Sequence, residues 1–394
     1  MGVGAAGGAG ALLYKLYPPT AFTRKAASIR STDVSSKGQF PVQFSDVTRD
    51  AGICFQHNSG AFGKKYLPET LGAGCAFFDY DNDGWLDVLL VNGMDWPGHK
   101  RQRATMKLYR NNRNGTFSET AVMAGVAFSE DGVARAGMGA DAADYDNSGL
   151  PSLVVTNFSQ QMVGLYRNEG HGFFVDEAPQ SAVGKSSRLT LGFGCFFFDV
   201  DLDGRLDLLV ANGHIDETIT RVESTISYAE SPHLFHNEGG GKFRDVVALV
   251  GKAFNQPKVA RGAAYGDFDN DGDLDVLITT NNGPAYLFRN DCAANHSIRF
   301  RTVGAKSNHD GIGANIRIWT PEGVRWLTVK SGSSYLSQSD RSVTFGLGGF
   351  ESIERAAIEW PSGLKQELGK LAADHTYVVE EGKGIVADVP HRRP

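Results

Sequence analysis

The chain has 394 residues and four cysteines, which are too few and too irregularly spaced to form a disulfide framework. Its formal net charge of −6 comes with no basic run and no aromatic-basic stripe, which argues against a nucleic-acid-binding protein. The acidity is concentrated in four short loops that hold 4, 2, 4 and 5 aspartates, so it does not indicate a basic partner.

The N-terminal segment, residues 2–14, is apolar and rich in glycine and alanine, but no basic residue precedes it. A membrane span needs about twenty apolar residues, and Lys15 interrupts this run. Three alternatives stay open: a truncated secretion signal, a segment that docks on a membrane or a protein, and a disordered tail. Residues 17–38, with Pro18-Pro19 and scattered serines, are typical of a linker, so residues 1–40 form one N-terminal region.

An aspartate-rich loop then occurs four times, each time directly before an apolar strand. In three copies aspartate occupies positions one, three, five and nine of the loop, and glycine follows the fifth position. In the second copy Ser148 and Ser152 replace two of these acids. Spacings of 65, 55 and 68 residues separate the first aspartates of the four loops, Asp79, Asp144, Asp199 and Asp267.

This pattern is typical of a calcium loop, because alternate carboxylates converge on one centre and glycine permits the sharp turn. Oxygen ligands in a flexible loop favour Ca²⁺ over Mg²⁺ or transition metals. The alternative is plain turn chemistry, but a turn does not require the distal aspartate. We predict three to four Ca²⁺ ions, with the second site the weakest because it has fewer charges. The expected ligands, including the backbone carbonyls of Trp85, Arg205 and Asp273, are Asp79, Asp81, Asp83, Trp85, Asp87, Asp144, Asp146, Ser148, Asp199, Asp201, Asp203, Arg205, Asp207, Asp267, Asp269, Asp271, Asp273 and Asp275.

The strands around the loops repeat as well. A small-residue strand precedes each loop and an apolar strand follows it. The third strand is Leu108-Tyr-Arg-Asn, Leu165-Tyr-Arg-Asn, Leu234-Phe-His-Asn or Leu287-Phe-Arg-Asn. Three units add a fourth strand, Thr116-Phe-Ser-Glu, Phe173-Phe-Val-Asp or Lys242-Phe-Arg-Asp. Four short strands per unit are typical of a propeller blade. The sequence therefore predicts an all-β fold in which residues 41–302 form a calcium-loaded β-propeller of at least four repeats.

The fourth-strand motif also precedes the first loop, in residues 44–53, and is missing from the last repeat. We therefore expect the N-terminal strand to complete the terminal blade and close the ring, which would hide the sheet edges. An open stack and a ring completed by the C-terminal region are the alternatives. The link between the second and third strands varies most, over residues 94–107 and 214–233, and such insertions favour one binding face.

The repeat period breaks after residue 302. Strand-like runs at 316–320, 324–329, 342–347 and 356–360 alternate with turns such as Pro321-Glu-Gly and Pro361-Ser-Gly. This alternation predicts a second, antiparallel β module over residues 303–384, followed by a tail over residues 385–394.

The chain resembles two known families. Its aspartate loops and glycine-rich strands resemble FG-GAP/VCBS-type repeats, which form calcium-loaded propeller blades. Its C-terminal part resembles the ASPIC/UnbV domain of the cartilage acidic protein-like family. The motifs that carry this second resemblance are Ser307-Asn-His-Asp-Gly-Ile-Gly-Ala314, Gly332-Ser-Ser-Tyr-Leu-Ser-Gln-Ser-Asp340, Phe345-Gly-Leu-Gly348, Trp360-Pro-Ser-Gly363 and Asn212-Gly-His214. The resemblance covers residues 44–380 and implies the fold, calcium and export, but no catalytic motif.

The cysteines bear on the compartment only weakly. Cys75 and Cys195 occupy the same position of two repeats. Equivalent positions of separate blades are too far apart for a disulfide, so we expect both cysteines to be small buried residues. Cys54 and Cys292 remain a candidate pair. Calcium sites of this class fill reliably only outside the cytosol, which favours the periplasm or the exterior.

No nucleophile elbow, phosphate loop or His-Glu-x-x-His motif occurs in the sequence. Our leading hypothesis is an extracytoplasmic calcium-binding β-propeller that serves as a non-catalytic binding or scaffold subunit. It would bind a protein partner and attach to a membrane complex through residues 2–14. One alternative is a biosynthetic enzyme whose insertion face gathers His214, Asp216, Glu217, His233 and His236. The other is a glycan-binding lectin that uses Trp85, Trp96, Tyr109 and Tyr166.

Overall fold

The structure is a computed structural model that describes residues 45–62, 74–81, 83, 85–95, 98–99, 104–292 and 295–392. The chain divides into two compact units, Met1–Val47 and Thr48–Pro394, and every strand named below belongs to the second. The expected N-terminal region, residues 1–40, lies outside the described residues. Within the described ranges, no helix has the length and apolarity that a membrane crossing requires.

The repeats fold as four antiparallel sheets, here called blades 1 to 4, whose strands are hydrogen-bonded in chain order. Blade 1 contains β1 (Cys75–Phe78), β2 (Asp87–Leu90), β3 (Lys107–Asn111) and β4 (Phe117–Glu119). Blade 2 contains β5 (Gly137–Ala143), β6 (Ser152–Asn157), β7 (Gly164–Asn168) and β8 (Phe174–Asp176). Blade 3 contains β9 (Gly192–Phe198), β10 (Asp207–Asn212), β11 (His233–Asn237) and β12 (Phe243–Asp245). In its described part, blade 4 contains β13 (Ala260–Gly266), β14 (Asp275–Thr280) and β15 (Tyr286–Phe288).

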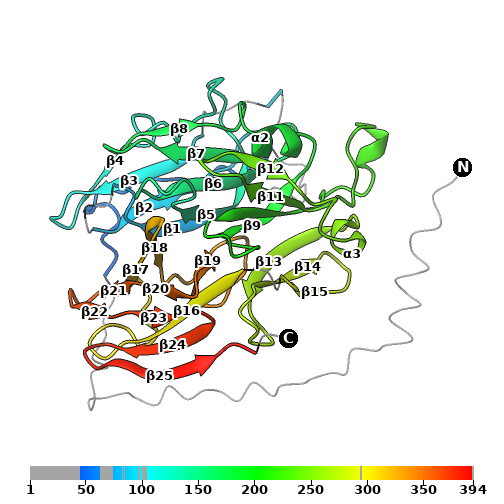
Figure 1. The fold of residues 1–394 in the computed structure, drawn as a ribbon. Coiled ribbons are helices and arrows are strands. Elements are labelled where there is room, and N and C mark those ends of the chain that lie inside the picture. Colours follow the sequence, from blue (N-terminus) through cyan, green and yellow to red (C-terminus); the bar gives the residue numbers. More distant parts are fainter. Residues whose placement is uncertain are drawn as a thin grey trace, which may run out of the picture. The chain divides into compact units, whose positions relative to one another are not determined.

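Neighbouring blades pack face to face because successive side chains of a strand point to opposite sides. In blade 2, Leu153 and Val155 pack with Leu89 of blade 1, whereas Val154 packs with Leu208 of blade 3. Blades 3 and 4 join through the same strand positions. Burying each such side chain contributes about 1.5–3 kcal/mol, so these interfaces are the main source of cohesion. The inner strands β5, β9 and β13 consequently lie side by side (Figure 1).

In the described part of the chain, regular helix is confined to short connections. Helix α2 (Ala182–Ser187) follows blade 2 and begins at Ser181, whose hydroxyl accepts a hydrogen bond from the Gly184 N–H. Helix α3 (Lys252–Asn255) precedes β13, and the 3₁₀ turn η2 (Ile219–Arg221) lies in the 214–233 insertion of blade 3.

The expected closing strand begins at Phe44, outside the described residues. Its continuation, residues 48–52, forms turns, as the matching residues 121–125 do after β4. Phe117 N–H donates to the Ala51 carbonyl at 2.8 Å, as Phe174 N–H donates to the Ala124 carbonyl at 2.8 Å one blade further on. This segment therefore lies against blade 1, and β15 is an edge strand in the described part of blade 4. Blades 1 to 4 stack in chain order, and closure of the ring by the N-terminal strand stays a prediction.

The C-terminal module packs two four-stranded sheets around one core, with Phe300, Ile316 and Trp360 among its buried residues. One sheet has the order β19-β16-β24-β25, the other β18-β17-β21-β22, and β20 pairs with β23. Antiparallel pairing was expected, but β16 and β24 run parallel. The strands also begin before residue 303 and continue past 384. They are β16 (His296–Val303), β17 (Asn315–Thr320), β18 (Gly323–Thr328), β19 (Val343–Gly348), β20 (Ser352–Ile353), β21 (Arg355–Glu359), β22 (Lys365–Leu368), β23 (Leu371–Ala372), β24 (His375–Glu380) and β25 (Gly384–Pro390).

Candidate metal centres in the aspartate loops

In loops 1, 3 and 4, hydrogen bonds from backbone N–H groups to the first and last acids hold the loop in shape. In blade 3, the Asp199 carboxylate accepts the Gly204 N–H at 2.7 Å. The Asp207 carboxylate accepts the N–H groups of Val200 at 3.0 Å and Asn237 at 2.7 Å. Because these bonds are local to the loop and the next strand, the repeated sequence produces the same turn in each blade.

The turn requires left-handed backbone at the fourth and sixth positions. In blade 3 these are Leu202, with φ 58°, and Gly204, with φ 89°. Glycine adopts this conformation without a Cβ penalty, whereas a leucine there is strained. Asn147 and Asn270, with φ 57° and 62°, tolerate the fourth position better. The chain thus accepts local strain to bring alternate acids onto one side of the loop.

The third loop position indicates a cation. One carboxylate oxygen, Oδ1, of Asp81, Asp201 and Asp269 is buried and has no hydrogen-bond partner within the described part of the chain. A buried, unpaired carboxylate oxygen costs free energy that a metal ion would offset. Each of these residues lies in a cluster whose ligand atoms are all within 4.8 Å of one another: Asp79, Asp81 and Asp87; Asp199, Asp201 and Asp207; Asp267, Asp269 and Asp271. All these donors are oxygens, so the residues fit a hard divalent cation such as Ca²⁺.

Loop 2, in blade 2, is different. Here the Ser148 N–H donates to Asp146 Oδ1 at 3.1 Å, so the oxygen that is unpartnered in the other loops has a partner. Ser152 Oγ accepts the Asn168 N–H at 3.0 Å, in place of a last carboxylate. No comparable group of three acids occurs among the described residues of this loop. The serines therefore keep the shape of the turn without its charge.

Burial makes the ionised state of these acids expensive. It raises the pKa of Asp207 to about 8 and that of Asp87 to about 6, and it raises the pKa of Asp199 well above its ordinary value. Neighbouring acids of the same loops add to these increases. A bound cation would favour the ionised carboxylates and reverse the effect.

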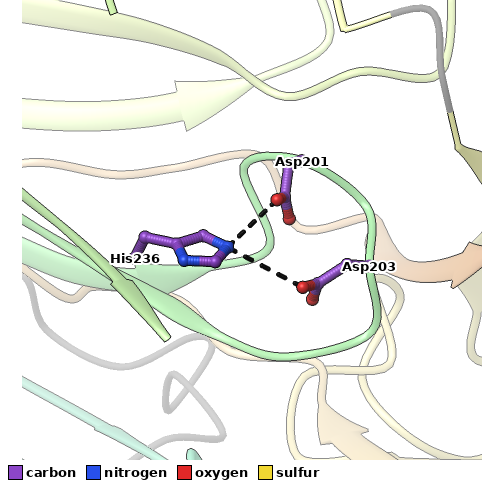
Figure 2. Close-up of side chains that lie close together, drawn as sticks. All are labelled: Asp201, Asp203 and His236. Carbon is purple, nitrogen blue, oxygen red and sulfur yellow. Dashed lines mark hydrogen bonds and ion pairs between the residues drawn. The ribbon is translucent and has the colours of Figure 1, made fainter. Parts of the chain in front are cut away.

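Basic side chains from the third strands lie beside the loops. Arg110 of β3 contacts Asp81 at 2.8 Å. In blade 3 the equivalent residue is His236 of β11, and its Nε2 lies 3.1 Å from Asp201 Oδ2 and 3.8 Å from Asp203 Oδ2. Figure 2 shows the imidazole pointing between the two carboxylates. Beside the third loop there is therefore an imidazole nitrogen, which can bind a metal, at the place where the first loop has a positively charged guanidinium group.

Within the described residues, the C-terminal module contacts loops 2, 3 and 4. Trp326 Nε1 donates to Asp144 at 2.9 Å, and the Gly348 N–H donates to the Leu202 carbonyl at 2.8 Å. The Arg299 guanidinium forms an ion pair with Asp267 at 2.6 Å, and their side chains are 5% and 0% exposed. Sequence analysis did not predict these contacts, because nothing in the local pattern links positions so far apart. The loops therefore belong to the interface between the repeats and the module.

The Gly332–Asp340 motif lies across the inner strands of three blades. Ser334 bridges to Ala140 of β5, and the Tyr335 ring packs against Phe193 of β9 at 5.0 Å between centroids. Ser339 Oγ accepts the Tyr265 N–H of β13 at 3.1 Å. Just before this motif, Lys330 pairs with the buried Asp141. The motif that carried the family resemblance is thus a structural joint between module and blades.

The suggested histidine cluster is not assembled. His214 Nδ1 accepts the Asp216 N–H at 3.1 Å, and burial lowers the pKa of His214. His233 Nδ1 lies 2.7 Å from Asp245 Oδ2, a cross-strand pair equivalent to Lys107 and Glu119 in blade 1. His236 of β11 contacts Asp201 of the third loop, and Glu217 is exposed. The expected residues therefore occupy separate environments.

The suggested aromatic surface is also divided. Tyr109 and Tyr166 are each 1% exposed and pack within the blades, Trp85 is exposed, and Trp96 lies outside the described residues. A cavity of about 760 Å³ lies beside β8 and β12, with Phe173, Asp176 and Lys242 among its lining residues, away from the 214–233 insertion.

All four cysteines are free, so Cys54 and Cys292 are not bonded to each other. Cys195 is buried as expected. The same expectation for Cys75 is wrong: the residue is exposed, and no blade among the described residues packs over its face of blade 1.

The fold and the loops define a β-propeller-like, all-β repeat protein with acidic turns joined to a C-terminal β module. Family profiles agree: "FG-GAP-like repeat" matches residues 79–155, 144–210 and 221–278, and "ASPIC and UnbV" matches residues 304–386. The chain belongs to the family of proteins that combine FG-GAP-like repeats with an ASPIC/UnbV domain.

The chain is also similar to individual proteins. It is 26% identical over 285 residues to cartilage acidic protein 1 of Mus musculus, covering 69% of this chain and 40% of that one. It is 35% identical over 72 residues to cartilage acidic protein 1 of Homo sapiens, covering 18% and 11%. The chain therefore spans less than half the length of these relatives.

Two solved structures are distantly similar to this chain. One is an Agrocybe aegerita lectin that recognises non-reducing terminal N-acetylglucosamine, with 16% identity, a TM-score of 0.33, and coverage of 77% of this chain and 80% of that one. The other is the V. cholerae biofilm matrix protein Bap1, with 10% identity, a TM-score of 0.25, and coverage of 81% and 60%. Likeness at this level supports no functional argument.

Proposed function

We propose that the protein is an extracytoplasmic calcium-binding β-propeller that acts as a non-catalytic binding or scaffold subunit. The observation that supports calcium most directly concerns one position of three loops: Oδ1 of Asp81, Asp201 and Asp269 is buried and has no hydrogen-bond partner among the described residues. An unpaired carboxylate oxygen costs free energy in each loop separately. Its recurrence at the same position of three loops is therefore better explained by a bound cation than by chance.

In this proposal the alternate aspartates of loops 1, 3 and 4 hold one ion each, and the backbone carbonyls of Trp85, Arg205 and Asp273 complete the shells. The ion supplies positive charge that stabilises crowded carboxylates; it takes no part in a reaction. Loop 2 binds most weakly, because Asp144 and Asp146 are its only acids. Calcium sites with this ligand set suit a compartment rich in the ion, which favours the periplasm or the exterior.

The scaffold role is supported by the joint between module and blades, because the Gly332–Asp340 motif contacts three blades. The separation of His214, His233 and His236 removes the cluster on which the enzyme alternative depended. We propose instead that the repeats and module form a rigid body for a protein partner, tied to a membrane complex by residues 2–14. Deletion of that segment, described in the Discussion, tests the attachment.

The calcium proposal is tested by titrating the full chain, stripped with chelator, with Ca²⁺ in a calorimeter. We expect at least three binding events. An Asp201→Asn, Asp203→Asn double variant should lose one of them, whereas Ser148→Ala should retain all of the strong ones. A titration without binding heat, at any calcium concentration up to millimolar, would refute the ligand assignment.

A further inference from the structure

Blade 4 exposes an apolar face, whereas the corresponding faces of blades 1, 2 and 3 are buried. Phe268, Leu277 and Leu287 are 53%, 42% and 56% exposed. Leu277 and Leu287 are direct cross-strand partners of β14 and β15, so their side chains share one face of the sheet. In blades 1, 2 and 3 the residues at these two positions are at most 2% exposed. Those at the position of Leu277 are Leu89, Val154 and Leu209, and those at the position of Leu287 are Leu108, Leu165 and Leu234.

Inside the stack, that face is covered by the next blade. Phe197 of blade 3 stacks on Tyr145 of blade 2 at 5.6 Å between centroids, and Cys195 packs in the same cluster as Val154. By loop position, Tyr145 is the counterpart of Phe268, and Val154 is the counterpart of Leu277. The covering surface is thus formed by the residues at the positions of Phe197 and Cys195.

Blade 1 exposes such a covering surface at the other end of the stack. Phe77 and Cys75 occupy the positions of Phe197 and Cys195. Phe77 is 70% exposed and Cys75 is exposed, whereas Phe197 is 3% exposed and Cys195 is fully buried. The outer part of this face of blade 1 is covered by its own chain, because the Tyr109 hydroxyl donates to the Cys54 carbonyl at 2.7 Å. Among the described residues of this face, Phe77 and Cys75 stay exposed.

We propose that the blade 4 face, defined by Phe268, Leu277 and Leu287, binds blade 1 of a second copy of this chain. The contact would repeat, between copies, the packing that one copy already makes between blades 1 and 2, 2 and 3, and 3 and 4. A second copy is the occupant that fits, since it carries Phe77 and Cys75 at the covering positions. In the described part of the chain both faces are open in the same molecule, so one copy does not cover its own blade 4 face.

This contact is heterologous, with different surfaces meeting. A pair of such contacts related by a two-fold axis closes an assembly of two chains and eight blades. Closure leaves neither apolar face in water, which a heterologous chain of copies never achieves at its ends.

The test is the mass of the full chain in saturating calcium, measured by light scattering after size exclusion. We expect twice the chain mass of 42.5 kDa. Leu287→Asp and Phe77→Asp, on opposite faces, should each halve that mass. Both residues are exposed, so the variants should keep the circular dichroism and melting temperature of a folded monomer. Val222→Asp, at a position 80% exposed in the 214–233 insertion, is the control and should remain paired.

A monomeric wild-type chain overturns the proposal. Dissociation by Leu287→Asp but not by Phe77→Asp also overturns it, because blade 1 is then not the partner. Cross-linking gives an independent readout. Leu277→Cys should form a disulfide with native Cys75 of the second copy when copper phenanthroline is added as the oxidant, and Cys75→Ser should abolish the linked dimer. A link that persists without Cys75 shows that another surface covers blade 4.

Discussion

Glu230 is a buried acid whose structural role needs no charge. Its Oε2 accepts the Leu191 N–H at 2.9 Å, ahead of β9. Its Oε1 is buried and has no partner among the residues that the structure describes. In blade 2 a neutral residue makes the equivalent hydrogen bond: Gln161 Oε1 accepts the Ala136 N–H at 2.8 Å, just before β5. Replacing Glu230 by Gln should therefore keep the hydrogen bond and remove the cost of a buried charge.

The size of the effect follows from the pKa. Burial raises the pKa of Glu230 to about 8 from its ordinary value of 4.5. A group with a raised native pKa contributes its full stability below the unfolded value and loses it as pH rises through the folded value. Between pH 5 and pH 8 the wild type should thus lose about 3 kcal/mol of unfolding free energy relative to Glu230→Gln.

The assay is urea unfolding of both proteins in saturating calcium at pH 5, 6.5 and 8. The gain in stability from Glu230→Gln should be small at pH 5 and grow at each step. The mirror variant, Gln161→Glu, should be tolerated at pH 5 and lose stability at pH 8. A stability difference that stays constant across the three pH values would refute the buried-charge argument.

Three further predictions concern the loops and the N-terminus. Chelating calcium should lower the melting temperature by several degrees, since an ion at 100 times its Kd adds about 2.7 kcal/mol per site; an unchanged melt in scanning fluorimetry would mean that the loops are only turns. Asp203→Ala or Asp271→Ala should reduce the unfolding free energy more than Ser148→Ala, and equal losses in urea unfolding would contradict the ligand assignment. Deleting residues 1–38 should leave calcium binding and melting nearly intact but abolish co-fractionation with membranes, so a truncated chain that still sediments with them would exclude the proposed attachment.

The repeats could be predicted from the sequence because their determinants are local. Asp199 and Gly204 lie five residues apart, and the hydrogen bond between them recurs in loops 2 and 4. The β strands that flank each loop follow from the same period. Loop 2 was likewise expected to differ, since Ser148 and Ser152 are visible in the sequence itself.

Features that depend on distant residues could not be predicted. Cys75 and Cys195 have the same local context, yet one is exposed and the other buried. Blade 2 packs over that face of blade 3, whereas no described blade packs over the same face of blade 1. Trp326 and Asp144 are 182 residues apart, and their contact depends on how the module docks on blade 2. The sequence of an aspartate loop predicts the shape of the loop but not which surface of the protein packs against it.

The ion pair between Arg299 and Asp267 links one loop to the module and sets two cations in competition. Both side chains are buried, and Arg299 Nε also donates to Thr344 Oγ1 at 3.0 Å. In Arg299→Met, Asp267 is left without its guanidinium, which should cost about 3–5 kcal/mol of unfolding free energy in chelator. Calcium in the fourth loop would compensate part of that charge, so the loss should be smaller in saturating calcium.

The fourth loop of this variant should also bind calcium more tightly, because a positive charge next to its first ligand is gone. Trp326→Phe is the matched control: it removes a neutral donor from Asp144 and should cost about 1–2 kcal/mol, with little dependence on calcium. Urea unfolding of both variants in chelator and in calcium decides the matter. If Arg299→Met loses the same free energy in both buffers, the guanidinium and the ion do not share Asp267, and the loop would not couple metal binding to the docking of the module.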